Sequence, residues 1–216
     1  MLVAPFQLHE RLLQLIEREA ENARRGLPAR IIAKINSLAE RQIIEALYRA
    51  SEAGVSIDLI VRGICCLRPG LKGLSKNITV RSIVDRFLEH SRIYYFENAC
   101  QPQVFLSSAD WLPRNLFRRI ELAFPIEDGI LRERLIHEVF ARSLADNVKA
   151  RLLQPDGSYP RARPAKGQPQ RRSQFEFIAL AAVEDNAPQR AGRSATRFPQ
   201  VKLAASPFVS KGTKII

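Results

Sequence analysis

The sequence predicts an α/β fold, in which a mixed sheet is flanked by helices, followed by a flexible basic tail. Short apolar runs rich in β-branched residues alternate along the chain with stretches whose apolar residues recur every three to four positions, and this is the order of an α/β sandwich. The 216 residues, 46% of them hydrophobic, are enough for one domain with a buried core. Basic residues and prolines gather after residue 150, so we expect the compact domain to end before the chain does.

The first quarter of the chain predicts a helix followed by a β-α-β unit. Apolar residues with helical spacing predict a helix over about 5–25, which Gly26 ends. The β-branched run at 29–36 predicts a strand, and the apolar stripe over 40–53 predicts a helix that ends at Gly54. The nearly continuous apolar run SIDLIV at 56–61 is typical of a buried parallel strand.

The middle of the chain continues the alternation. Residues 62–77 are rich in Gly, Pro and Cys and are expected to form a loop at the carboxyl end of the preceding strand. The elements expected after it are a helix over 80–89, strands over 92–97, 104–107 and 118–124, and a helix over 128–144.

The last third differs in composition. Residues 1–150 hold 22 Lys and Arg against 18 Asp and Glu, whereas residues 151–216 hold 12 against 4. Segments 148–153 and 158–163 are expected to pair around the turn residues at 155–158. We therefore expect one domain over 1–164 and a largely disordered basic tail over 165–216, with no element assigned beyond about residue 185.

Several classes of protein are excluded or disfavoured. No apolar run approaches the roughly 20 residues of a membrane span, and no secretory signal precedes Gln7, so we expect a cytoplasmic protein. Cys65, Cys66 and Cys100 match neither a disulfide framework nor zinc spacing, and no metal site is predicted. Neither a phosphate-binding Walker loop nor a dinucleotide fingerprint is present in the sequence.

A group of basic residues falls where strands are expected to begin or end. These residues are Arg62, His90, Arg92, Arg114, Arg118 and Arg119. Guanidinium groups at strand ends suit phosphate, because their fork binds two oxygens at once and stays charged. Imidazole can act as a nucleophile or proton donor near neutral pH, so His90 is the candidate for phosphoryl chemistry. The alternative is that these are solvated surface residues, as arginines usually are.

Nearby carboxylates receive structural interpretations. Asp110, next to Trp111, is expected to cap or shape a loop, and Glu97 at a strand end is expected to form a salt bridge. Glu127 and Asp128 suit the start of a helix, where negative charge complements the helix dipole.

Three ordered blocks carry a family resemblance. LIVRGICCLRPG (59–70), SIVDRFLEHSRIYYFEN (82–98) and VFLSSADWLPRN (104–115) closely resemble the C-terminal catalytic domain of bacterial polyphosphate kinases, whose catalytic halves look like phospholipase D domains. The resemblance runs from about residue 6 to about residue 163. It implies a phospholipase D-like sandwich. Where the family has a glycine pair after F-E-N, this sequence has Ala99 and Cys100, which a turn with positive φ would tolerate poorly.

The resemblance also implies an activity. It implies reversible transfer of the terminal phosphate of ATP to inorganic polyphosphate through a phosphohistidine in a preceding catalytic half that this chain does not contain. ATP and ADP are then substrates, Mg²⁺ is expected to bind mainly outside this chain, and the isolated chain is expected to be inactive. The domains that precede this one in the family are the expected partners in trans, with self-association as a further expectation.

The resemblance assigns roles to individual residues. His90 resembles the second active-site histidine, which assists proton transfer and nucleotide binding. Arg62 matches a phosphate-contacting arginine, and Arg119 lies where the family has another active-site arginine. Arg92 and Arg118 join them as phosphate-binding residues. His90, Arg92, Glu97 and the pair Ser107–Ser108 approximately fill the phospholipase D pattern of histidine, lysine, carboxylate and serine.

Two other classes of function stay open at this point. One is a non-catalytic module that binds polyphosphate or nucleic acid through its basic face and tail. The other is a phospholipase D-like nuclease or phosphodiesterase in which two copies pair their histidines.

Overall fold

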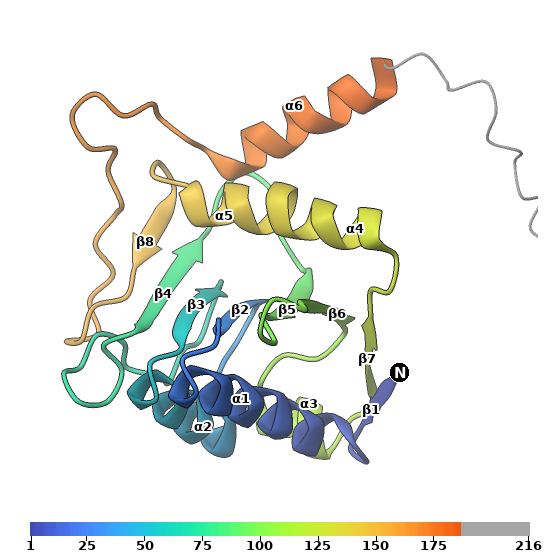
Figure 1. Ribbon diagram of the computed structural model, residues 1–216. Coiled ribbons are helices and arrows are strands. Elements are labelled where there is room, and N and C mark those ends of the chain that lie inside the picture. The colour runs from blue at the N-terminus through green and yellow to red at the C-terminus, as the bar shows by residue number, and fades with distance from the viewer. Residues whose placement is uncertain (187–216) are drawn as a thin grey trace, which may run out of the picture.

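The computed structural model describes residues 1–186 and contains one mixed sheet with helices on both faces (Figure 1). This confirms the predicted α/β fold class. The strands are β1 (Leu2–Ala4), β2 (Arg30–Ile35), β3 (Ser56–Val61), β4 (Ile78–Ile83), β5 (Arg92–Phe96), β6 (Gln103–Ser107), β7 (Glu121–Pro125) and β8 (Ala150–Leu152). The helices are α1 (Leu8–Arg24), α2 (Arg41–Glu52), α3 (Pro113–Phe117), α4 (Gly129–Arg134), the π-helix η1 (Leu135–Phe140), α5 (Ala141–Ala145) and α6 (Ser173–Asn186).

The strand order in the sheet is β1-β7-β6-β5-β2-β3-β4-β8. β2, β3 and β4 are parallel, and all other neighbours are antiparallel. The β-α-β unit expected over the first quarter of the chain is therefore present as β2-α2-β3. Its two strands pair from Arg30 opposite Ser56 to Ile35 opposite Val61.

The larger core lies between the sheet and α1, α2 and α3, which cover one face (Figure 1). α1 contributes Leu8, Leu12, Leu15 and Ile16, which share one side of the helix because they recur every three to four residues. α2 begins at a buried cap, since the Glu40 carboxylate accepts hydrogen bonds from the two backbone N–H groups that follow Arg41.

The other face is covered by α4, η1 and α5, which follow one another without a break (Figure 1). The predicted helix over 128–144 thus corresponds to three helical segments. The core on this face of the sheet is smaller and centres on Ile32, Ile60, Ile93 and Phe140. Strands β2, β3 and β5 bury side chains on both faces, as the apolar runs in their sequences predict.

The predicted helix over 80–89 is wrong. Ile78–Ile83 forms β4, which pairs with β3 and β8, and residues 84–91 form a loop. The helical spacing of Ile83, Val84, Phe87 and Leu88 misled the prediction, because the last three side chains are exposed. Ile78 and Val80 instead face the larger core while Ile83 faces the smaller one, so burial on both faces favours the strand.

Smaller differences concern element ends. The strand expected over 118–124 begins only at Glu121, and α3, β1 and α6 were not predicted, α6 lying where a largely disordered tail was expected. Segment 158–163 does face β8, through backbone hydrogen bonds from Leu152 to Pro160 and from Ala162 to Ala150. Among residues 1–186, none of the helices combines the length and apolar character that a bilayer crossing requires.

The expected tail falls partly within the described residues. Residues 165–172 form a connecting segment, and α6 then lies beside α5 (Figure 1). Ser173 and Gln174, at the start of α6, are buried. The remainder of the expected tail, from residue 187, lies outside the described residues.

Candidate active site

The loops that carry the predicted site residues meet at one edge of the sheet. β2, β3 and β4 end at this edge, whereas β5 and β7 begin there because each is antiparallel to its neighbours. Arg62 follows β3, His90 precedes β5, and Arg118 and Arg119 precede β7. Ligands in open α/β sheets bind outside such strand ends, so this edge is the candidate active site.

His90 is exposed at the end of loop 84–91 and lies against Arg92. The two guanidinium terminal nitrogens of Arg92 lie 3.1 Å from His90 Nδ1 and 3.3 Å from His90 Nε2, and one also donates to the His90 carbonyl at 3.1 Å. A guanidinium can only donate hydrogen bonds. In such a hydrogen bond the imidazole nitrogen is therefore the acceptor.

Arg92 is held from behind by the buried carboxylate of Asp110. Arg92 Nε lies 3.2 Å from one Asp110 oxygen, and Nη2 lies 3.0 Å from the other. Asp110 also accepts from the backbone N–H of Asn36 at 2.7 Å and from its side-chain amide at 3.2 Å. Burial acts to raise the pKa of Asp110, but the hydrogen bonds from Arg92 and Asn36 outweigh it and lower that pKa.

Arg62 reaches the same loop from β3. Its guanidinium donates to the carbonyl of Glu89, the residue before His90. The Glu89 carboxylate accepts from Lys34 Nζ at 2.5 Å and from the Gln174 amide at 2.9 Å. Lys34 is buried on β2, so Glu89 ties the loop to the centre of the sheet and to α6.

Arg118 and Arg119 are placed at the same edge but not in contact with His90. Both are exposed in the segment between α3 and β7, and within residues 1–186 neither side chain has an ion pair. Two strand spacings separate β7 from β5, which is roughly 10 Å at the usual strand separation. Arg114, the remaining member of the basic group, is exposed on α3.

The carboxylate of the site is Asp110 and not Glu97. Glu97 follows the far end of β5 and accepts a hydrogen bond from the Tyr95 hydroxyl, so it is separated from His90 by the length of the strand. Ser107 and Ser108 point into the local structure, where Ser107 donates to the Leu122 carbonyl at 2.8 Å and Ser108 donates to Glu121. The expectation that Asp110 only shapes a loop missed its ion pair with Arg92.

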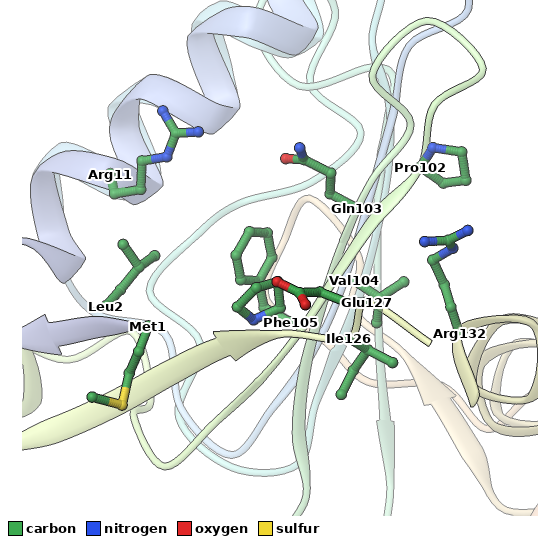
Figure 2. Close-up of a pocket in the computed structure, with 11 residues that line it drawn as sticks. Met1, Leu2, Arg11, Pro102, Gln103, Val104, Phe105, Ile126, Glu127 and Arg132 are labelled. Carbon is green, nitrogen blue, oxygen red and sulfur yellow. The ribbon is translucent and has the colours of Figure 1, made fainter. Parts of the chain in front are cut away.

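Among the hollows of the described residues, one lies beside the candidate site and another lies at the opposite edge of the sheet. One, of about 570 Å³, lies under loop 84–91 and is lined by residues of that loop, β5, β6, η1 and α6. The other, of about 430 Å³, lies at the opposite edge of the sheet, where Figure 2 shows Arg11, Gln103 and Arg132 around it and Glu127 between them. The second hollow is remote from His90, because the length of strands β5 and β6 lies between them.

The described part of the chain does not form a metal site of its own. Among its residues, no three His, Cys, Asp or Glu side chains are grouped so that they could hold a metal ion. Arginine side chains, among them Arg62 and Arg92, bring positive charge to this edge.

Comparison with known proteins identifies the family. The family model described as polyphosphate kinase C-terminal domain 2 matches residues 1–174. The chain belongs to this family. The resemblance seen in the three sequence blocks is thereby confirmed, and the match extends past the expected boundary at residue 164 to Gln174 at the start of α6.

Curated relatives place the domain within longer proteins. The chain is 60% identical over 165 residues to a polyphosphate kinase of Neisseria meningitidis serogroup B and 57% identical over 163 residues to one of Paraburkholderia phytofirmans. In both cases the match covers 76% of this chain and 24% of the relative. The chain therefore spans about a quarter of the length of these polyphosphate kinases.

Solved structures support the same fold. The crystal structure of polyphosphate kinase from Porphyromonas gingivalis superimposes with a TM-score of 0.80 at 43% identity, over 85% of this chain and 28% of that one. A phospholipase D family member, Nuc from Salmonella typhimurium, gives a TM-score of 0.51 at 15% identity, over 70% of this chain and 95% of that one. The second likeness is one of fold alone, and the domain has the phospholipase D-like sandwich that the resemblance implied.

The sequence did not point to several residues that build the site. Lys34, Asn36 and Gln174 were not singled out, although Lys34 and Gln174 hold Glu89 beside His90 and Asn36 holds Asp110, the partner of Arg92. Lys34 had a local signal, because it is a charged residue between the apolar residues Ala33 and Ile35 of β2. Gln174 had none, since it lies 85 residues from Glu89.

Proposed function

We propose that the chain is the C-terminal catalytic part of a polyphosphate kinase, which transfers the terminal phosphate of ATP reversibly to inorganic polyphosphate. The observation that supports this is the family match over residues 1–174 together with the cation-rich edge around His90. In this proposal the phosphoryl group moves from ATP to a histidine nitrogen supplied by a part of the enzyme outside this chain, and ADP leaves. The phosphohistidine then passes the group to the terminal oxygen of polyphosphate.

The roles of the residues follow from their positions. His90 is proposed to hold or donate a proton at the reacting phosphate, because its imidazole is exposed at the site edge beside the Arg92 guanidinium. Arg62 and Arg92 are proposed to bind phosphate oxygens beside it, and Arg118 and Arg119 to bind the chain of phosphates farther along the edge. Mg²⁺ is proposed to enter with the nucleotide and to bind mainly outside this chain, since the described residues offer no ligand cluster.

A complementation experiment tests this function. The full chain is mixed with a separately expressed remainder of a related polyphosphate kinase, and ATP-dependent formation of polyphosphate is measured. We expect activity only from the mixture, and none from the chain alone. Polyphosphate formation no greater than that of the remainder alone would contradict the proposal.

Variants sharpen the same experiment. His90→Ala is expected to lower the rate at least about 100-fold, as loss of a proton-transfer group does. Arg119→Ala is expected to cost about 10-fold or more through lost charge stabilisation. His137→Ala is the matched control, because His137 is exposed on η1 and, within residues 1–186, its ring pairs with Glu133 on the preceding α4 and not with a site residue.

A non-catalytic polyanion-binding module is the second candidate, supported by the net charge of +12 and the exposed Arg118 and Arg119. Such binding weakens steeply with salt, because it releases condensed counterions. Polyphosphate binding that is salt-sensitive and unchanged by His90→Ala, without activity in the mixture, would favour this module over the kinase.

A further inference from the structure

We propose that Gln174 is a positioning residue for His90, because its buried side chain holds the loop 84–91 in place from the start of α6. The inference rests on the proposed function for the role of His90, but the hydrogen bonds that support it do not depend on the identity of the substrate. In this proposal the beginning of α6, which lies in the segment expected to be a tail, helps to position an active-site residue.

Loop 84–91 has little apolar packing of its own. Val84, Phe87 and Leu88 are 66%, 51% and 78% exposed, and no regular secondary structure joins β4 to β5. A loop without a buried apolar anchor depends on hydrogen bonds for its position. The loop passes beside the start of α6, where such bonds are available (Figure 1).

Gln174 supplies three of these bonds and uses its whole amide to do so. Its Nε2 donates to the Phe87 carbonyl and to a Glu89 carboxylate oxygen, both at 2.9 Å, and its Oε1 accepts from the Phe87 N–H at 2.9 Å. The side chain thereby pairs with Phe87 as a neighbouring strand would. Gln174 is 4% exposed, so these bonds are shielded from competing water.

The bond from Gln174 to Glu89 acts on the residue beside His90. The second Glu89 oxygen accepts from Lys34, and the Glu89 carbonyl accepts from Arg62. Glu89 is therefore fixed from three sides by β2, β3 and α6. Because His90 follows directly, a shift of Glu89 would move the imidazole away from Arg92.

The anchor itself is rigid. Arg172 forms a two-point ion pair with Asp85, at 2.7 and 2.6 Å, at the other end of the loop. Asp146 accepts from the Ser173 N–H and hydroxyl, both at 2.8 Å, and from the backbone N–H groups of residues 148–150, where β8 begins. The start of α6 is thus fixed to the body of the domain, and the hydrogen bonds of Gln174 hold the loop against it.

The test compares Gln174→Leu with Gln168→Leu in the full chain. Both replace an amide by an apolar side chain of similar size, but Gln168 is exposed and its side chain makes no hydrogen bond within residues 1–186. We expect Gln174→Leu to speed amide hydrogen exchange at residues 86–91 at least about 10-fold while exchange in β2 and β3 keeps its rate. The NMR signals of the His90 ring should shift or broaden, and Gln168→Leu should leave both readouts unchanged.

The transfer reaction gives a second readout in the mixture described above. Gln174→Leu is expected to lower kcat about 10-fold or more with KM for ATP changed less than about threefold, because misplacement of a reacting group affects the transition state. Unchanged exchange in the loop, or a loosened loop with unchanged kcat, would overturn the positioning role. If the wild-type mixture forms no polyphosphate, the proposed function fails, and the positioning of His90 is decided by exchange and the His90 ring signals alone.

Discussion

At the scale of single residues, Asp110 determines where Arg92 can lie. Its two oxygens accept from the guanidinium, and one of them also accepts from Asn36. The side chains of Arg92 and Asp110 are only 12% and 8% exposed, so water could not solvate either charge well if its partner were removed. Removal of one partner from a buried pair is strongly destabilising.

Asp110→Asn tests this pair through its pH dependence. The folded-state pKa of Asp110 is lowered, so its ionised form contributes stability above the ordinary carboxyl range near about pH 4, and the contribution is lost as pH falls below that range. We expect Asp110→Asn to lower the free energy of unfolding by about 3 kcal/mol at pH 7 and by less at acidic pH, in urea titrations.

Glu45→Gln is the control for that measurement. Glu45 pairs with Arg41 on the exposed side of α2, and such solvated pairs contribute little to stability. A difference between wild type and Asp110→Asn that stays the same from pH 7 to acidic pH would contradict the assigned ionisation.

At the scale of elements, the turn between β5 and β6 carries backbone strain. Asn98, Ala99 and Cys100 all have positive φ, at 49°, 52° and 67°. Asn98 is held by its N–H, which donates to the buried Glu19 at 2.9 Å. Ala99 and Cys100 therefore occupy the left-handed region that the family's glycine pair suits, and there a Cβ is disfavoured.

Glycine at these positions should therefore stabilise the domain. Ala99→Gly and Cys100→Gly are each expected to raise the free energy of unfolding by about 1 kcal/mol, measured as a higher Tm. Ala23→Gly in α1 should have the opposite sign, since glycine costs about 1 kcal/mol inside a helix. A lower Tm for both turn variants would show that the turn does not need positive φ.

Prediction of the elements from sequence succeeded where a pattern had one interpretation. The helix at α2 and the strand at β3 were predicted within a residue or two, because each stripe or run matches a single period. β4 failed because its residues fit a helical stripe as well as a strand, and only pairing with β3 and β8 favours the strand.

At the scale of the whole molecule, apolar side chains remain exposed along the site edge. Val84 and Leu88 project from loop 84–91, and Ile120, before β7, is 80% exposed. Exposed apolar patches mark interaction surfaces. The chain also spans about a quarter of its curated relatives, whose other parts are the expected partners for this edge.

Self-association of the isolated chain follows from this surface. We expect the apparent mass by light scattering to rise with protein concentration, and the double variant Leu88→Asn with Ile120→Asn to reduce the rise. Ile130→Asn is the matched control, because Ile130 is 69% exposed at the start of α4, near the opposite edge. A monomer at every concentration would contradict the expectation.

The sequence by itself determined the α/β class, the β-α-β unit, the family, and the loops on which the basic residues lie. These depend on local periodicity and on contiguous sequence blocks, both of which can be recognised in the sequence itself. Only the tertiary structure decided that β4 is a strand, that Asp110 pairs with Arg92, and that Gln174 holds the loop before His90. The two side-chain contacts join residues 18 and 87 positions apart, and the strand β4 depends on its neighbours in the sheet. No local sequence pattern encodes which distant group will complete a buried hydrogen bond.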